Sequence, residues 1–155
     1  MIMQACQIPL LETGRSALAA EVADAIAILN LTECTEVPAQ GYYLSCENSS
    51  LVLNTADGEK LQPVLSKPAN FSAKQPLLRA LAPARGGTVI DATAGLAGDS
   101  LRLAMIADSV IAIERNAVVY ALLVSALHTA KSASLTMAGK IEPRFGDCLL
   151  YTSDA

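Results

Sequence analysis

The sequence VIDATAGLAGDS, residues 89–100, decides the fold. It places an apolar strand, a carboxylate at the end of that strand, a loop of small residues and the start of a helix in direct succession. Such a unit brings a ligand close to backbone amides at the carboxyl edge of a parallel sheet. Gly95 and Gly98 permit a tight turn and a close approach of the ligand, whose space bulky side chains would fill.

The residues around this loop alternate between strand and helix patterns. Strands are predicted at 88–91, 109–113 and 141–146, and helices from about residue 98 and over 117–129. This alternation is typical of a parallel, doubly wound sheet. We therefore expect residues 88–155 to form the N-terminal half of a Rossmann-like domain, an α/β fold whose sheet is incomplete in this chain.

A small α/β unit is predicted upstream, over residues 1–65. Its expected elements are a strand at 8–11, a helix at 16–29 with helical spacing of Leu18, Val22, Ala25, Ile26 and Leu29, and strands at 42–46, 51–54 and 61–65. The turn signals at 48–49 and 57–58 arrange these three strands as a small β-meander. Residues 66–87 are predicted to form a basic linker with one short helix near 75–81.

The segment 60–85 carries positive charge and contains no acidic residue. Its cations are Lys60, Lys67, Lys74, Arg79 and Arg85. The net charge of the chain is −4, so its overall field does not attract nucleic acid, and any RNA contact requires a local basic patch. The segment is consistent either with a solvated linker or with an RNA-binding surface.

The loop and the next strand end indicate which ligand the fold holds. The loop lacks the lysine of the G-x-x-x-x-G-K-[ST] motif and does not match G-x-G-x-x-G, which disfavours a nucleoside triphosphate or a dinucleotide. Glu114 ends the next strand roughly 20 residues further on, where an acid accepts hydrogen bonds from the two hydroxyls of a ribose. Asp91 suits a positive amino group or a sulfonium. S-adenosylmethionine carries both cations and a ribose.

A third strand end, at Gly146, Asp147 and Cys148, would lie beside the adenine if the sheet has the usual order. Each candidate also has a structural alternative: Asp91 and Glu114 as ordinary strand-end acids, and Arg115 as a solvated charge. Asp99 is also consistent with an acid that stabilises the first turn of a helix. Asp147 with Cys148 is consistent with a common turn. His128 lies late in an apolar helix and is expected to be structural.

Two motifs, DATAGLAGDS at 91–100 and IAIERNAVVYALL at 111–123, resemble the adjoining cofactor motifs of the bacterial small-subunit (16S) ribosomal RNA guanine-N2-methyltransferase family lettered J. A weaker resemblance extends upstream over nearly the whole chain. It implies a Rossmann-like methyltransferase fold, S-adenosylmethionine as cofactor and small-subunit ribosomal RNA as partner. By motif, the implied cofactor-binding residues are Asp91, Gly95, Gly98, Asp99, Glu114, Arg115, Asp147 and Cys148.

The family pattern continues with a strand that ends in an Asp-Pro-aromatic motif and positions the target amine, and the chain stops before this motif. We therefore expect the catalytic residues beyond residue 155 and expect the chain to be a C-terminally truncated, inactive fragment. The tail LLYTSDA, residues 149–155, departs from the family pattern and resembles readthrough into non-native sequence.

The composition of the chain narrows the classes of protein to which it can belong. The four cysteines form no C-x-x-C pair and accompany a single histidine, which argues against a zinc cluster and a dense disulfide framework. The longest apolar run, 117–127, is shorter than the roughly 20 residues that cross a bilayer, and no secretory signal is evident. We expect a cytoplasmic protein without metal or membrane contact. The rival functions are methylation of a protein or small molecule and non-catalytic nucleoside binding.

Overall fold

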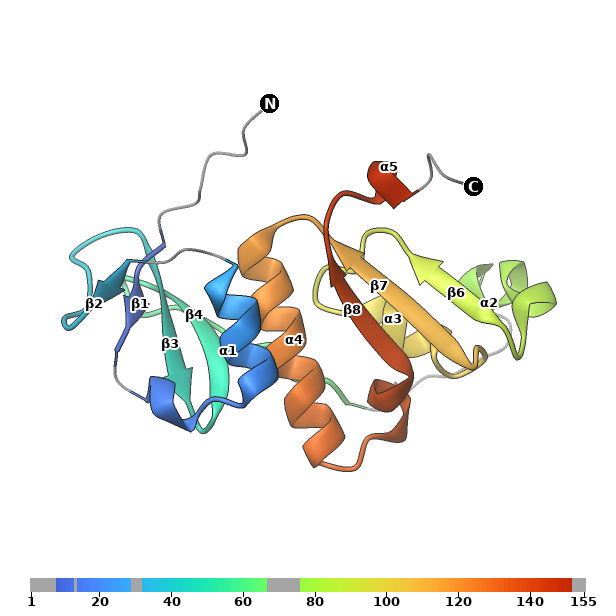
Figure 1. Cartoon of the computed structure of the whole chain (residues 1–155), viewed down its shortest axis with the longest axis horizontal. Helices are drawn as coiled ribbons and strands as arrows, with labels where there is room; N and C mark the ends of the chain where they lie inside the picture. Colours follow the sequence, from blue (N-terminus) through green and yellow to red (C-terminus); the bar gives the residue numbers. More distant parts are fainter. Residues whose placement is uncertain (1–7, 13, 29–31, 67–75, 152–155) are drawn as a thin grey trace.

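The computed structural model describes residues 8–12, 14–28, 32–66 and 76–151, which form two sheets on either side of a long central helix (Figure 1). The first sheet has the strand order β2-β1-β3-β4-β5 and the second the order β6-β7-β8. The second sheet is parallel throughout. The predicted α/β class with a Rossmann-like sheet is therefore confirmed.

The second sheet contains β6 (Thr88–Asp91), β7 (Ser109–Glu114) and β8 (Ile141–Phe145). The connections between them are α3 (Gly98–Leu103), α4 (Ala117–Ser132) and the 3-10 helix η3 (Thr136–Lys140). These bounds match the predicted strands and helices within three residues. The sheet side chains Val89, Val110, Ala112 and Ile141 belong to one core cluster with Leu101, Leu123 and Leu127 of α3 and α4. Both helices therefore cover the same face of the sheet.

The first sheet contains β1 (Leu10–Leu11), β2 (Glu33–Cys34), β3 (Tyr42–Glu47), β4 (Ser50–Thr55) and β5 (Lys60–Leu61). The antiparallel meander of β3, β4 and β5 is confirmed. The predicted last strand, 61–65, is too long, because Leu65 leaves the sheet and packs against the core of the other sheet. Strand β2 was not predicted, since two residues carry no periodic pattern.

The helix predicted over 16–29 is shorter than expected. Residues Arg15–Ala17 form the separate 3-10 helix η1, and α1 spans Ala20–Ala27. Between them, Leu18 and Ala19 have extended backbones, and both pack partly buried against the core of the first sheet. That burial requires the chain to bend before the helix begins. Residues 29–31 lie outside the described residues.

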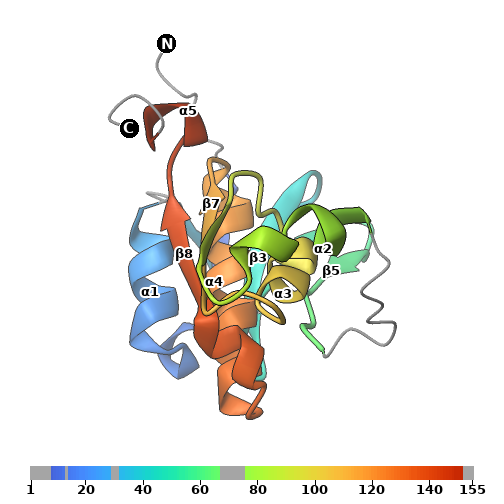
Figure 2. The ribbon, with the colours of Figure 1, turned by 90° about the vertical axis from the view of Figure 1, so that its right-hand side faces the viewer.

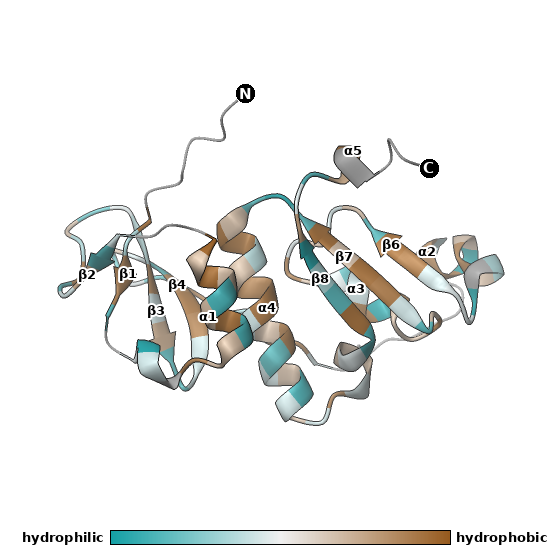
Figure 3. Ribbon diagram, in the orientation of Figure 1, coloured by the Kyte–Doolittle hydropathy of each residue, from teal (hydrophilic) through white to brown (hydrophobic). Residues whose placement is uncertain are grey.

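Helix α4 is shared by the two sheets. Its side chains Val118, Ala121 and Leu122 pack with β1, β3, β4 and α1, whereas Leu123 and Leu127 pack with the second sheet. The buried residues of α4 include the unbroken run from Ala121 to Leu127 rather than one stripe, and Figure 3 shows apolar residues on the side of this helix that faces the viewer. Each fully buried leucine contributes about 1.5–3 kcal/mol to the stability of the fold. The helix therefore joins two cores into one structure.

Hydrogen bonds between polar groups also hold β4 against α4. The backbone N–H of Leu51 in β4 donates to Ser125 Oγ at 2.8 Å, and Ser50 Oγ lies 2.8 Å from Thr129 Oγ1. Because Leu51 is buried, its amide would carry a desolvation cost without this acceptor. The two bonds fix the position of β4 along α4.

Between the two sheets, the structure describes residues 62–66 and then the residues from Pro76 onward. Helix α2 (Pro76–Ala80) and the 3-10 helix η2 (Ala82–Ala84) precede β6, which confirms the short helix predicted near 75–81. The predicted domain boundaries at 65 and 87 stay a prediction. Lys67 and Lys74 of the basic segment lie outside the described residues.

Candidate functional site

A cleft of about 450 Å³ opens at the carboxyl ends of the parallel strands β7 and β8. The short helix α5 (Cys148–Tyr151) lies beyond the end of β8 in both views of the chain (Figure 2). The volume of the cleft falls in the usual range for small-ligand pockets, roughly 300–1,000 Å³. The lining residues are Ala92, Thr93, Ile113, Glu114, Arg115, Gly146, Asp147, Cys148 and Leu149.

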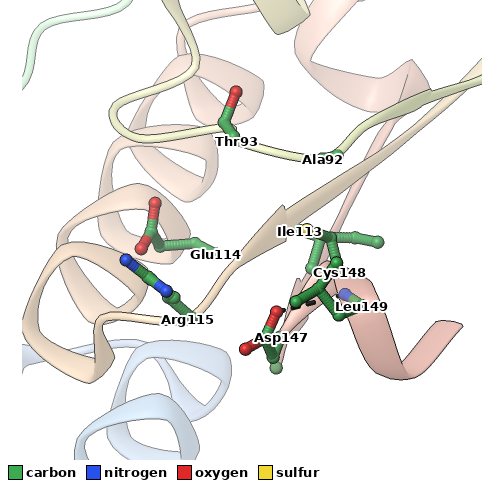
Figure 4. A pocket seen from close by; sticks show the side chains of 9 residues that line it. Ala92, Thr93, Ile113, Glu114, Arg115, Asp147, Cys148 and Leu149 are labelled. Carbon is green, nitrogen blue, oxygen red and sulfur yellow. Dashed lines mark hydrogen bonds between the residues drawn. The ribbon is translucent and has the colours of Figure 1, made fainter.

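The cleft brings together four of the eight predicted cofactor-binding residues. Figure 4 shows Glu114 and Arg115 on one side and Asp147, Cys148 and Leu149 on the other, with Ala92 and Thr93 above. The lining positions that the motifs did not single out are Ala92, Thr93, Ile113 and Leu149. Each of them lies within two residues of a predicted position, so proximity to a strand end was the available signal.

The other four predicted residues do not line the cleft. Asp91 is the last residue of β6, Gly95 lies in the loop that follows it, and Gly98 and Asp99 begin α3. The Asp99 carboxylate lies 2.6 Å from the Arg102 guanidinium, one turn further along the helix. That pairing, on exposed side chains, is the arrangement expected of an acid that stabilises a helix start.

The Glu114 carboxylate connects the ends of two loops. Its Oε2 accepts a hydrogen bond from the Gly95 amide at 3.1 Å, and its Oε1 accepts one from the Asn116 amide at 2.7 Å. The Asn116 side chain in turn caps α4 by accepting from the amides of Val118 and Val119. The carboxylate therefore has a fixed orientation at the cleft wall, set by the backbone on both sides.

The backbone amides of the loop are largely engaged inside the protein. The amide of Thr93 donates to Asp91 Oδ1, that of Ala94 to the Ile113 carbonyl, and that of Gly95 to Glu114. The Ala97 amide donates to the Ala94 carbonyl at 2.8 Å. Phosphate-binding loops instead present such amides to the ligand. The geometry agrees with the sequence argument against a triphosphate or dinucleotide ligand.

The rest of the cleft combines charge with apolar surface. Asp147 Oδ1 accepts from the Leu149 amide at 3.1 Å, which fixes this second carboxylate at the end of β8. Ile113 is almost fully buried, whereas Leu149 is largely exposed. Behind the cleft, the rings of Tyr120 and Phe145 lie 5.4 Å apart between α4 and β8. Two carboxylates, one guanidinium and two aliphatic side chains thus line the cleft.

The described residues contain neither a candidate membrane span nor a candidate metal cluster. Within them, none of the helices has the length and apolarity that crossing a membrane demands. In the same part of the chain, His, Cys, Asp and Glu side chains nowhere form a group of three that could hold a metal ion. His128 lies outside the cleft, with Nδ1 3.9 Å from Glu21 Oε2 of α1.

Comparison with known proteins identifies relatives of the chain. A family model described as SAM-dependent methyltransferase matches residues 28–144. The ribosomal RNA small subunit methyltransferase J of Alteromonas mediterranea is 32% identical over 125 residues, which are 73% of this chain and 48% of that protein. The protein of the same name from Rhodopseudomonas palustris is 46% identical over 61 residues, 39% of this chain and 28% of that protein.

These relatives confirm the family resemblance inferred from the two motifs, and the chain spans at most about half of their length. Among solved structures, a SAM-dependent methyltransferase from Neisseria gonorrhoeae superposes with a TM-score of 0.69 at 23% identity. The superposition covers 95% of this chain and 64% of that one. It shows that both proteins share the fold.

Proposed function

The chain belongs to the family of SAM-dependent methyltransferases, and from this premise we propose that its cleft binds S-adenosylmethionine for methylation of a guanine N2 amine in small-subunit ribosomal RNA. The cofactor follows from the family, and small-subunit ribosomal RNA is the substrate that the names of the relatives give. The guanine N2 amine is what the resemblance of the two motifs implies. A ribosomal substrate agrees with the cytoplasmic location expected from the sequence. The observation that carries the proposal is the fixed carboxylate of Glu114 at the cleft wall.

The Glu114 carboxylate fits a ribose. An ionised carboxylate has about four lone-pair positions, and the Gly95 and Asn116 amides each use one. Each oxygen thus retains the capacity to accept one further hydrogen bond. Two acceptors fixed in one plane match the two vicinal hydroxyls of a ribose, so this residue can hold the sugar without losing its own structural bonds.

The remaining lining residues suit the other parts of the cofactor. The carboxylates of Glu114 and Asp147 complement a ligand that carries a sulfonium and an amino group. Ile113 and Leu149 supply apolar surface for a purine ring. We propose that Arg115 and Cys148 complete the site, and that Gly95, Gly98 and Asp99 contribute through the shape of the loop and the start of α3.

Bound S-adenosylmethionine would supply an electrophilic methyl group on its sulfonium sulfur. The chain's own residues bind and orient, since catalysis of this transfer rests mainly on proximity and in-line alignment. The guanine N2 amine is a weak nucleophile, because its lone pair is delocalised into the ring. It therefore needs acceptors that hold it at near-attack distance, and we propose that they belong to the Asp-Pro-aromatic motif of the family.

The RNA contact is proposed for the basic segment 60–85. Within its described part, Arg79 and Arg85 are exposed, whereas the Lys60 ammonium lies 2.6 Å from the Glu47 carboxylate. Replacing Lys67, Lys74 and Arg79 together by alanine should lower RNA affinity and flatten its salt dependence, because fewer counterions are released. Cofactor affinity should stay unchanged. Equal salt slopes for variant and parent would assign the segment to a linker.

The decisive experiment has two stages. Calorimetry with S-adenosylhomocysteine should give saturable binding, and a flat titration would refute the cofactor site. Radiolabelled methyl transfer is then measured with unmethylated small-subunit RNA, a protein pool and a small-molecule pool, with the Alteromonas mediterranea relative as reference. We expect cofactor binding by this chain and methyl transfer to RNA by the reference. Turnover by this chain at the reference rate would show that acceptors for the amine lie within residues 1–155.

A further inference from the structure

A fully buried hydroxyl lies directly behind the loop of the cleft. Ser100, in the first turn of α3, has an exposed fraction of 0%. Its Oγ donates to Asp91 Oδ2 at 2.6 Å. A short bond to a carboxylate is among the stronger hydrogen bonds in proteins, and breaking it would leave a buried polar group without its partner. The bond therefore fixes the Asp91 side chain against α3.

The second oxygen of the same carboxylate holds the loop. Asp91 Oδ1 accepts from the Thr93 amide at 3.2 Å, and Thr93 together with Ala92 lines the cleft. Asp91 itself does not line it. Helix α3 itself is held in place, because Leu101 and Leu103 are buried in the core of the second sheet. A chain of contacts thus runs from the core through Ser100 and Asp91 to the cleft wall.

We propose that Ser100 and Asp91 are positioning residues, which set the conformation of the Ala92–Thr93 wall and thereby the affinity of the cleft for its ligand. The inference rests on the proposed binding of S-adenosylmethionine. It differs from a direct role of Asp91 toward the ligand's amino group, since Asp91 does not line the cleft, whereas Thr93, whose amide donates to Asp91 Oδ1, does. Ser100 acts only through Asp91.

Two ligands separate positioning from direct contact. S-adenosylhomocysteine carries the amino-acid group, and 5′-methylthioadenosine lacks it. If Asp91 positions the wall, Ser100→Ala and Asp91→Asn should each weaken both ligands by the same factor, about tenfold, the order expected for one hydrogen bond to a charged group. If Asp91 contacts the amino group, Asp91→Asn should weaken S-adenosylhomocysteine alone and Ser100→Ala should weaken neither. That pattern would overturn the proposal.

Ser125→Ala is the matched control. Ser125 is also a buried serine, 2% exposed, with one strong hydrogen bond, but it holds β4 rather than the loop. Its loss should lower stability without changing either dissociation constant. Hydrogen exchange at the Thr93 amide should accelerate in Ser100→Ala and not in Ser125→Ala, which tests the contact without a ligand.

The outcomes distinguish this inference from the proposed function. If the parent chain binds neither ligand, the cofactor site and the positioning role both fall. If the parent binds both ligands and Ser100→Ala binds them equally well, only the positioning role falls. If Ser100→Ala does not fold, Asp91→Asn decides alone, because equal loss for both ligands supports positioning and loss for one ligand refutes it.

Discussion

Replacing Glu114 by glutamine tests the proposed ribose site with the smallest change in shape. The amide side chain has one acceptor oxygen, whereas the carboxylate accepts from both Gly95 and Asn116. Glutamine can therefore satisfy only one of these amides, and its NH₂ group would face the other. A hydrogen bond to a charged group contributes about 1.5–3 kcal/mol, and one of the two is partly solvent-exposed. We expect the free energy of unfolding to fall by about 1–2 kcal/mol.

Glu114→Gln should also weaken ligand binding. Loss of the charge and of one acceptor toward the ribose should weaken S-adenosylhomocysteine by about 2 kcal/mol, or roughly 30-fold. Glu114→Ala should weaken it at least as much. Titration calorimetry measures the dissociation constants, and urea unfolding measures stability in the same samples.

A control on the neighbouring strand isolates the site. Glu142 in β8 pairs with Arg144 at 2.8 Å and does not line the cleft. Glu142→Gln removes the same charge from the chain, so it should leave the dissociation constant unchanged. An unaltered constant in Glu114→Gln, measured in a folded variant, would refute the ribose assignment.

Three further predictions concern stability. Asn116→Ala should cost about 1 kcal/mol in urea unfolding, because the first turn of α4 loses its cap, and Asn116→Asp should retain most of it. Ala97 is buried with φ 64°, so Ala97→Val should destabilise the fold by more than about 2 kcal/mol, whereas Ala97→Gly should change it by less than about 1 kcal/mol. Burial raises the pKa of the Cys46 thiol, and the Arg15 guanidinium partly offsets this rise. Since the folded chain holds this proton more tightly than the unfolded chain, stability should decline as pH rises above about 8.5, less so in Cys46→Ser.

The strand ends carried most of the information about the candidate site. Glu114, Asp147 and Cys148 were predicted from their places at two strand ends, and Arg115 was predicted from the family motif. The structure places all four around one cleft. Parallel strands in adjacent positions end at the same edge of a sheet, so the sequence was sufficient to bring them together. The cofactor contacts of all eight predicted residues stay a prediction.

The hydrogen-bond partners of the half-buried Asp91 carboxylate could not be predicted from the sequence. Asp91 was predicted to face the ligand, yet its hydrogen bonds go to Ser100 and to the Thr93 amide. Both partners lie within nine residues, but the pattern of residue types does not specify which way a carboxylate turns at a strand end. That choice depends on how closely α3 packs on β6, which is a property of the assembled core.

The sequence by itself determined the local units: the strands at 88–91, 109–113 and 141–146, the glycine loop between the first strand and α3, and the meander upstream. These signals are local, because hydrophobic period, turn residues and caps act over a few neighbouring residues. Only the tertiary structure decided how the two sheets share α4. A helix that is apolar on all sides has no single stripe to indicate its partner, and only the packed chain shows that Leu122 faces one sheet and Leu123 the other.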